Sequence, residues 1–267
     1  LYGFNINKSA IYSSSSRLVE AEIVTYDLCH ENGWWPDFDA LESMDLDGVK
    51  IMWTNYPNMP TGAAASEELY AKLVDFGRRH GILICNDNPY SFILNDRPLS
   101  ILAQPGAKEC CLELNSLSKA HNMAGWRIGM VAAEPEIISE ILKVKSQMDS
   151  GMFKPLQVAA VEALSQGPEW FAELNAEYAR RRVLAGEIFD MLGAEYDHDS
   201  TGMFLWGRVG QAGAEVSDKL LYEAGVFITP GFIFGKNGEN YIRISLCSKP
   251  EVLKRAAEKI KAVIRKD

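Results

Sequence analysis

The first half of the chain alternates between a helical and a strand-like hydrophobic pattern. Apolar positions recur at helical spacing over residues 67–80, with Ser66 placed to cap the start and Gly81 after the end. Continuous apolar runs, typical of strands buried on both faces, cover residues 82–85, 110–114 and 128–133. Helices that alternate with buried strands indicate an α/β fold, with a mostly parallel sheet sandwiched by helices.

After Glu134 the pattern changes, because long amphipathic stretches take over from the buried runs. These stretches predict helices over residues 135–148, 155–165 and 169–192. The last third predicts strands over 203–206, 226–229 and 241–246 and helices over 215–224 and 250–264. We therefore predict a large domain over residues 11–150 and a smaller α+β domain with its linking helix over residues 151–267. Residues 1–10 stay unassigned.

Charge and composition restrict the function. A formal net charge of -9 disfavours nucleic acid or an anionic membrane as the main partner, since both bind clustered Lys and Arg. No apolar run is long enough to cross a bilayer. The five cysteines lack CxxC spacing and the four histidines lack ligand spacing, so we expect reduced core thiols, no metal site and a cytoplasmic protein.

Polar side chains follow two of the predicted strands. Residues 82–85 lead into Asn86-Asp87-Asn88-Pro89-Tyr90, and residues 110–114 lead into Asn115-Ser116-Leu117-Ser118-Lys119. In an open parallel sheet, ligands bind beyond the carboxyl ends of the strands. An acid, a phenol, hydroxyls and an amine at adjacent strand ends therefore predict a small-molecule site.

Four segments together resemble one enzyme family. Residues 116–129 are similar to the signature S-x-x-K-x-x-N-x-x-G-x-R-x-G, residues 87–90 to D-x-x-Y, and residues 55–62 to an N-P-T-G element. Residues 229–235 and 241–245 are similar to a closing P-G-x-x-F-G and R-I-S pattern. In this order and spacing they resemble the class I/II aminotransferases, which implies the type I fold of enzymes that use pyridoxal 5′-phosphate (PLP).

The resemblance implies a role for each matching residue. Lys119 would hold PLP as a Schiff base and move the proton, Asp87 would pair with the pyridine nitrogen, and Tyr90 would donate to the phenolic oxygen. Arg127, with Ser116 and Ser118, would hold the phosphate. Arg243 would bind the substrate α-carboxylate, with Asn58 as a weaker candidate for substrate contact. The implied reaction exchanges an amino group between an amino acid and a 2-oxo acid in a homodimer.

Simpler roles are open for several of these residues. Asp87 could only form a turn, Ser116 could cap one, and Arg243 could face solvent or a structural carboxylate. Met59 stands where the family usually has an asparagine, which leaves a decarboxylase, a β-lyase or a non-catalytic relative as alternatives. The family's N-terminal portion has no counterpart in residues 1–10. We expect residues to be missing near Ala10, with a truncated relative as the alternative.

Overall fold

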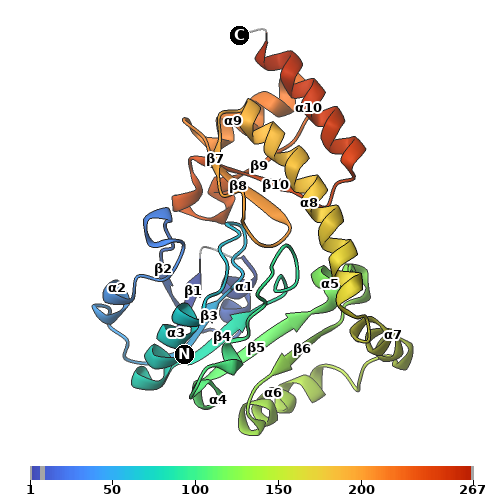
Figure 1. The fold of residues 1–267 in the computed structure, drawn as a ribbon. Coiled ribbons are helices and arrows are strands. Elements are labelled where there is room, and N and C mark those ends of the chain that lie inside the picture. Colours follow the sequence, from blue (N-terminus) through green and yellow to red (C-terminus); the bar gives the residue numbers. More distant parts are fainter. Residues whose placement is uncertain (1, 7–9, 266–267) are drawn as a thin grey trace.

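The computed structural model describes residues 2–6 and 10–265, which form two sheets joined by a long helix (Figure 1). The larger sheet has six strands in the order β2-β1-β3-β4-β5-β6. Its first five strands are parallel, and β6 is antiparallel to β5. The strands are β1 (Tyr2–Ile6), β2 (Glu22–Tyr26), β3 (Val49–Thr54), β4 (Leu83–Asp87), β5 (Cys111–Ser116) and β6 (Gly129–Ala132). The predicted α/β class and mostly parallel sheet are confirmed.

The core of this part forms where α3 (Glu67–His80) packs on the sheet. Leu69, Leu73 and Phe76 of the helix are fully buried and belong to the same cluster as Met52 and Ile84 of the strands. The Ser66 hydroxyl accepts a hydrogen bond from the Leu69 amide at 3.0 Å, and Gly81 ends the helix in the left-handed conformation. Helix α3 therefore begins and ends where the sequence predicts.

The smaller sheet has four strands in the order β7-β8-β10-β9. The strands are β7 (Glu195–Tyr196), β8 (Phe204–Arg208), β9 (Thr229–Pro230) and β10 (Tyr241–Ser245). Helices of this part of the chain include α9 (Gly213–Lys219), η4 (Leu220–Ala224) and α10 (Pro250–Ile264). Helix α8 (Pro168–Met191) runs from beside the larger sheet to the smaller one, where it packs along α10 (Figure 1). A second core cluster joins these helices to the sheet and includes Tyr90. We propose the predicted division after residue 150, with α8 as the linking helix.

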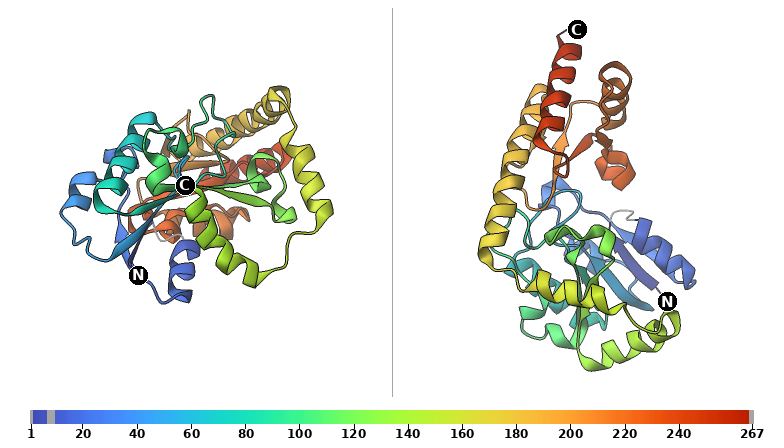
Figure 2. Two further views of the ribbon diagram at one scale, coloured as in Figure 1. Left: turned by 90° about the horizontal axis from the view of Figure 1, so that it is seen from below. Right: turned by 90° about the vertical axis from the view of Figure 1, so that its right-hand side faces the viewer.

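The remaining elements connect these layers, and Figure 2 shows the fold from two more sides. They are α1 (Ala10–Leu18), α2 (Phe38–Glu42), α4 (Ala107–Cys110), α5 (Leu117–Ala120), α6 (Pro135–Met148), α7 (Lys154–Leu164), η1 (His30–Asn32), η2 (Ile101–Ala103), η3 (Ala124–Trp126), η5 (Gly231–Phe234) and η6 (Lys236–Gly238). Among the described residues no helix is long and apolar enough to span a membrane. Cys85, Cys110 and Cys111 are buried free thiols.

The structure corrects three expectations. Strand β6 is an edge strand, so Met130 is 59% exposed and the predicted burial of residues 128–133 on both faces is wrong. Residues 226–228 are not a strand, since only Thr229–Pro230 pair with β10. Residues 2–6, which were unassigned, form β1 between β2 and β3; residues 1 and 7–9 lie outside the described residues.

Candidate active site

The carboxyl ends of β4 and β5 lie side by side and bring the two polar segments together. Asp87 pairs in register with Leu114. Just beyond, the Asn88 amide donates to the Leu114 carbonyl at 2.8 Å, and the Asn115 side chain donates to the Asn88 carbonyl at 2.9 Å. Helix α5, which contains Lys119, begins directly after β5. Asp87 and residues 116–119 therefore lie at the same edge of the sheet.

Asp87 is half-buried, and among the described residues only one of its carboxylate oxygens accepts a hydrogen bond. Its Oδ2 accepts a hydrogen bond from the Tyr12 hydroxyl at 2.5 Å, whereas Oδ1 has no hydrogen-bond partner among the described residues. Burial raises the pKa of this carboxyl above its ordinary value, and the hydrogen bond from Tyr12 opposes that rise. The free oxygen can accept a further hydrogen bond from a ligand.

Tyr12 is a site residue that the sequence did not single out. It lies on α1 and stacks on Trp53 of β3, with ring centroids 4.9 Å apart. Burial is the largest cause that raises the pKa of Tyr12, followed by the charge of Asp87, so this phenol donates at neutral pH. Nothing in the local sequence pattern indicated this contact across 75 positions.

Tyr90 connects the strand end to the smaller sheet. It is 7% exposed, and its ring meets Phe204 of β8 edge-on at 6.0 Å. Burial, followed by the negative charge of Asp87, raises the pKa of Tyr90 to about 12. The phenol therefore stays protonated and can donate a hydrogen bond.

Lys119 is half-buried on α5. Neither its ammonium group nor the Ser118 hydroxyl has a hydrogen-bond or ion-pair partner among the described residues. Ser116, by contrast, is the N-cap of α5, since its Oγ accepts from the Ser118 amide at 3.1 Å. The capping role considered for Ser116 is thus present.

Arg127 lies at the end of the same segment but is exposed. Its backbone is left-handed, with φ of 55°, and its Nη1 donates to the Ala124 carbonyl at 3.0 Å. The guanidinium is therefore held against its own turn, and its other nitrogens stay available to an anion.

In the loop after β3, both polar atoms of the Asn58 side chain form hydrogen bonds. Asn58 Nδ2 donates to the Asn55 carbonyl at 3.2 Å, and its Oδ1 accepts from the Thr61 hydroxyl at 2.7 Å. Asn58 is also only 3% exposed. These contacts stabilise the loop and do not favour the predicted substrate contact of Asn58.

Arg243 crosses from β10 of the smaller sheet to this loop. Its guanidinium carbon lies 4.2 Å from the ring centroid of Phe204 and 4.5 Å from that of Phe234, and Nη1 donates to Met59 Sδ at 3.2 Å. The buried Nε has no hydrogen-bond partner among the described residues. Burial lowers the pKa of Arg243, yet the group stays charged at any physiological pH. Arg243 is a half-buried cation without an acidic partner among the described residues.

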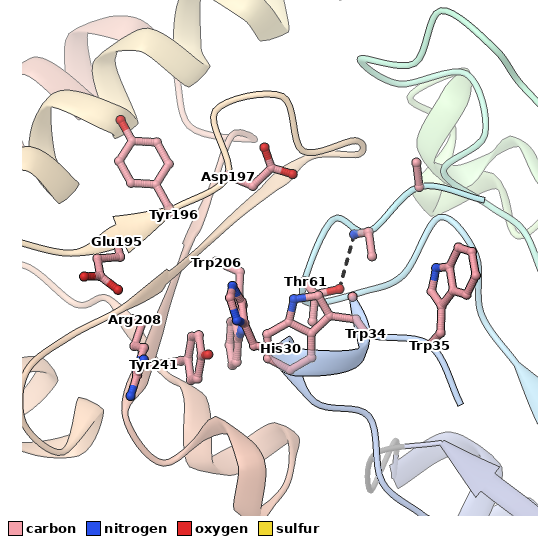
Figure 3. Close-up of a pocket in the computed structure, with 13 residues that line it drawn as sticks. His30, Trp34, Trp35, Thr61, Glu195, Tyr196, Asp197, Trp206, Arg208 and Tyr241 are labelled. Atoms are coloured by element: carbon pink, nitrogen blue, oxygen red, sulfur yellow. Dashed lines mark hydrogen bonds between the residues drawn. The ribbon is translucent and has the colours of Figure 1, made fainter. Parts of the chain in front are cut away.

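A separate aromatic cleft lies between residues 30–35 and the smaller sheet (Figure 3). Trp34, Trp206 and Tyr241 line it, and Glu195 and Arg208 border it. Tyr241 stacks on Trp206 at 4.9 Å and meets Trp34 edge-on at 5.5 Å. Neither Asp87 nor Lys119 lines this cleft, so we place the candidate active site at the strand ends.

Comparison with known proteins gives one family. The family model described as "Aminotransferase class I and II" matches residues 8–260. The LL-diaminopimelate aminotransferase of Dehalococcoides mccartyi is 38% identical over 254 residues, which cover 94% of this chain and 66% of the relative. That of Aquifex aeolicus is 40% identical over 241 residues, covering 89% and 62%. The chain thus spans about two thirds of the length of the curated relatives it matches.

Solved structures with a similar fold include further aminotransferases. The apo-BacF structure from Bacillus subtilis has a TM-score of 0.92 at 34% identity, covering 98% of this chain and 72% of that one. The aromatic aminotransferase from Pyrococcus horikoshii has a TM-score of 0.89 at 28% identity, covering 99% and 73%. These TM-scores show that both have the same overall fold as this chain over nearly its whole length.

Proposed function

Because the chain belongs to the class I and II aminotransferase family, we propose that it moves an amino group between an amino acid and a 2-oxo acid, with PLP as its cofactor. The observation that carries this proposal is the side-by-side ending of β4 and β5, which presents Asp87 and Lys119 at one edge of the sheet. LL-Diaminopimelate, named for the relatives, is the first substrate to test.

The donor set at this edge fits PLP. The cofactor needs an anion for its ring nitrogen, a donor for its phenolic oxygen, an amine for its aldehyde, and donors for its phosphate. Asp87 offers the free Oδ1, Tyr90 a protonated phenol and Lys119 an unpaired amine. Ser118 and Arg127 offer donors for the phosphate, whereas the Ser116 hydroxyl beside them already donates to the Ile128 carbonyl at 3.3 Å. When bound, PLP supplies an electron sink that stabilises negative charge at the substrate Cα.

Each of these residues then has a task of its own. Lys119 would hold the cofactor covalently and, once released as an amine, would take up and return a proton at Nζ. Asp87 would bind the ring nitrogen through its carboxylate, which would favour the protonated form of that nitrogen. Tyr12 supports this charge through its hydrogen bond to Oδ2.

Arg243 is the residue we assign to the substrate carboxylate. Its buried Nε lacks a partner, and an unsatisfied buried donor costs free energy that a bound carboxylate recovers. Phe204 and Phe234 exclude water from the faces of the guanidinium, which strengthens its attraction for an anion. We further propose that the protein is a cytoplasmic homodimer.

Two measurements test the proposed function. Adding PLP should produce visible absorbance, and borohydride reduction should fix the cofactor on a peptide that contains Lys119. Lys119→Ala should lose both signals, whereas Lys143→Ala, a matched change at an exposed lysine of α6, should keep them. Absence of a lysine-bound cofactor would favour a non-catalytic relative.

The reaction type is tested with the loaded protein. Addition of a substrate amino acid should leave the pyridoxamine form of the cofactor in stoichiometric yield, because only amino-group transfer produces it in full. Release of CO₂ or loss of a β-substituent would instead favour a decarboxylase or a β-lyase, which the replacement of asparagine by Met59 keeps as the second candidate.

A further inference from the structure

Arg243 is held on three sides by groups that cannot neutralise its charge. The rings of Phe204 and Phe234 lie over the guanidinium at 4.2 and 4.5 Å, and the Met59 sulfur accepts from Nη1 at 3.2 Å. Aromatic faces attract a cation without taking a directed hydrogen bond. The two rings therefore restrict the plane of the Arg243 guanidinium, but they do not restrict its rotation within that plane.

Among the described residues, only the hydrogen bond to Met59 fixes that rotation. Once Nη1 is engaged, the remaining edge of the fork consists of Nε and Nη2, and Nε has no partner among the described residues. A carboxylate pairs with a guanidinium through two neighbouring N–H groups. The geometry points to Met59 as a positioning residue that reserves the Nε–Nη2 edge of Arg243 for the substrate carboxylate.

Met59 is itself fixed relative to the cofactor side of the site. Its backbone amide donates to Asn55 Oδ1 at 2.9 Å, and Asn55 Nδ2 donates to the Asp87 carbonyl at 2.7 Å. A chain of contacts thus runs from Asp87 through Asn55 and Met59 to Arg243. It sets the distance between the end of β4 and the carboxylate site, so a substrate held by Arg243 is aligned with groups at that strand end.

The choice of sulfur has a consequence for affinity. A thioether is a weak acceptor, so it orients the guanidinium while leaving its positive charge available. A carboxylate at position 59 would form an ion pair and compete with the substrate. This residue therefore tunes carboxylate affinity without touching the reacting atoms.

This inference rests on the proposed function, and the experiment separates the two. Wild-type protein and variants are first loaded with PLP, and the absorbance and borohydride fixation are recorded. The dissociation constant of 2-oxoglutarate is then measured by titration calorimetry, and KM and kcat are measured with the same acid. The variants are Met59→Leu, which removes the acceptor; Met59→Gln, which supplies another of similar length; and Met59→Glu. Met191→Leu is the control, since Met191 is half-buried beside the second core on α8.

We expect Met59→Leu to raise the Kd about threefold to tenfold, the equivalent of one hydrogen bond, and to raise KM more than it lowers kcat. Met59→Gln should have a Kd within about twofold of wild type, because its side-chain oxygen can accept the same hydrogen bond from Arg243. Met59→Glu should weaken binding more than Met59→Leu does. Met191→Leu should bind as wild type does.

Three results would overturn the role of Met59: wild-type affinity in Met59→Leu, equal weakening in Met59→Gln and Met59→Leu, or no saturable binding by loaded wild type. If the thermal midpoint shows that Met59→Leu does not fold, the dissociation constants of Met59→Gln and Met59→Glu are compared instead. Equal constants for these two variants would then overturn the role of Met59. Failure to load PLP would instead overturn the proposed function itself.

Discussion

Two opposing effects determine the ionisation of Asp87. Burial favours the neutral carboxyl and raises its pKa, whereas the hydrogen bond from Tyr12 favours the carboxylate. The raised pKa of Tyr12 keeps the proton on the phenol, so the direction of this hydrogen bond is fixed. Tyr12 therefore maintains the charge that the proposed mechanism needs at Asp87.

Removing that hydrogen bond gives the first prediction. In Tyr12→Phe the pKa of Asp87 should rise further, so the carboxylate should protonate at higher pH than in wild type. The acid limb of the pH dependence of kcat/KM should shift to higher pH, and kcat should fall roughly tenfold, which corresponds to about 1.4 kcal/mol in the barrier. The measurement is a pH–rate profile of the PLP-loaded protein.

A matched control for this change is available in the smaller sheet. Tyr196 donates to Asp190 Oδ1 at 3.3 Å, so Tyr196→Phe also removes a hydrogen bond between a tyrosine and an aspartate. Its pH profile should match that of wild type. A profile of Tyr12→Phe that coincides with the wild-type profile would show that Tyr12 does not act through Asp87.

The candidate site shows which residues local sequence can predict. Lys119, Asp87 and Tyr90 lie at strand ends as expected, because their segments follow buried apolar runs directly. Tyr12 and the pairing of Met59 with Arg243 were not predicted, since these contacts join residues 75 and 184 positions apart. Such contacts depend on which strands become neighbours, and local periodicity carries no such information.

At the scale of elements, helices with strong caps were predicted best. The bounds of α3, α6 and α10 agree with the sequence pattern, since each has a serine cap or a proline in its first turn. Strands were predicted less well. The apolar run at β6 is the same for a central and an edge strand, and only the sheet order shows that it lies at an edge.

The cap of α3 supports a stability prediction. Ser66→Ala removes the side-chain acceptor of the Leu69 amide and should destabilise the protein by about 1 kcal/mol. Ser66→Asp keeps an acceptor and should stay close to wild type. Urea unfolding of the three proteins measures the difference. Equal midpoints for wild type and Ser66→Ala would show that the cap adds nothing to global stability.

The contact between α2 and α3 supports a pH prediction. Glu42 of α2 accepts from Arg79 at 2.6 Å, and its second oxygen lies 2.9 Å from His80 Nε2. The hydrogen bond from Arg79, and then that from His80, lowers the pKa of Glu42. A carboxyl whose pKa is lower in the folded state stabilises the protein above its unfolded pKa, and this contribution is lost as the pH falls through the folded value.

Glu42→Gln should therefore make the stability of the protein fall less steeply as the pH is lowered. The thermal midpoint of wild type should fall more steeply than that of the variant as the pH drops below the ordinary range of glutamate, and the difference should be small because the group is exposed. Glu140→Gln, which removes an exposed pair with Lys143 on α6, is the control. Parallel pH curves for wild type and Glu42→Gln would contradict this assignment.

At the scale of the whole molecule, α6 and α7 stand apart from the other long helices. Neither has a fully buried residue, whereas both cores bury several residues of α3, α8 and α10. The exposed large apolar residues in and between α6 and α7 are Leu142, Val144, Met148, Met152, Phe153, Val158, Val161 and Leu164. An apolar surface of this kind indicates a site of association, which supports the proposed homodimer.

Association through these helices can be tested with one charge. Val161 is 69% exposed, and Val161→Glu would place a carboxylate in an apolar interface, where burial of an unpaired charge is unfavourable. We expect wild type to sediment as a dimer and Val161→Glu to dissociate at least about tenfold more readily. Val183→Glu, a matched change at a 64% exposed valine on α8, should remain dimeric. A monomeric wild type, or equal dissociation of both variants, would mean that α6 and α7 do not form the interface.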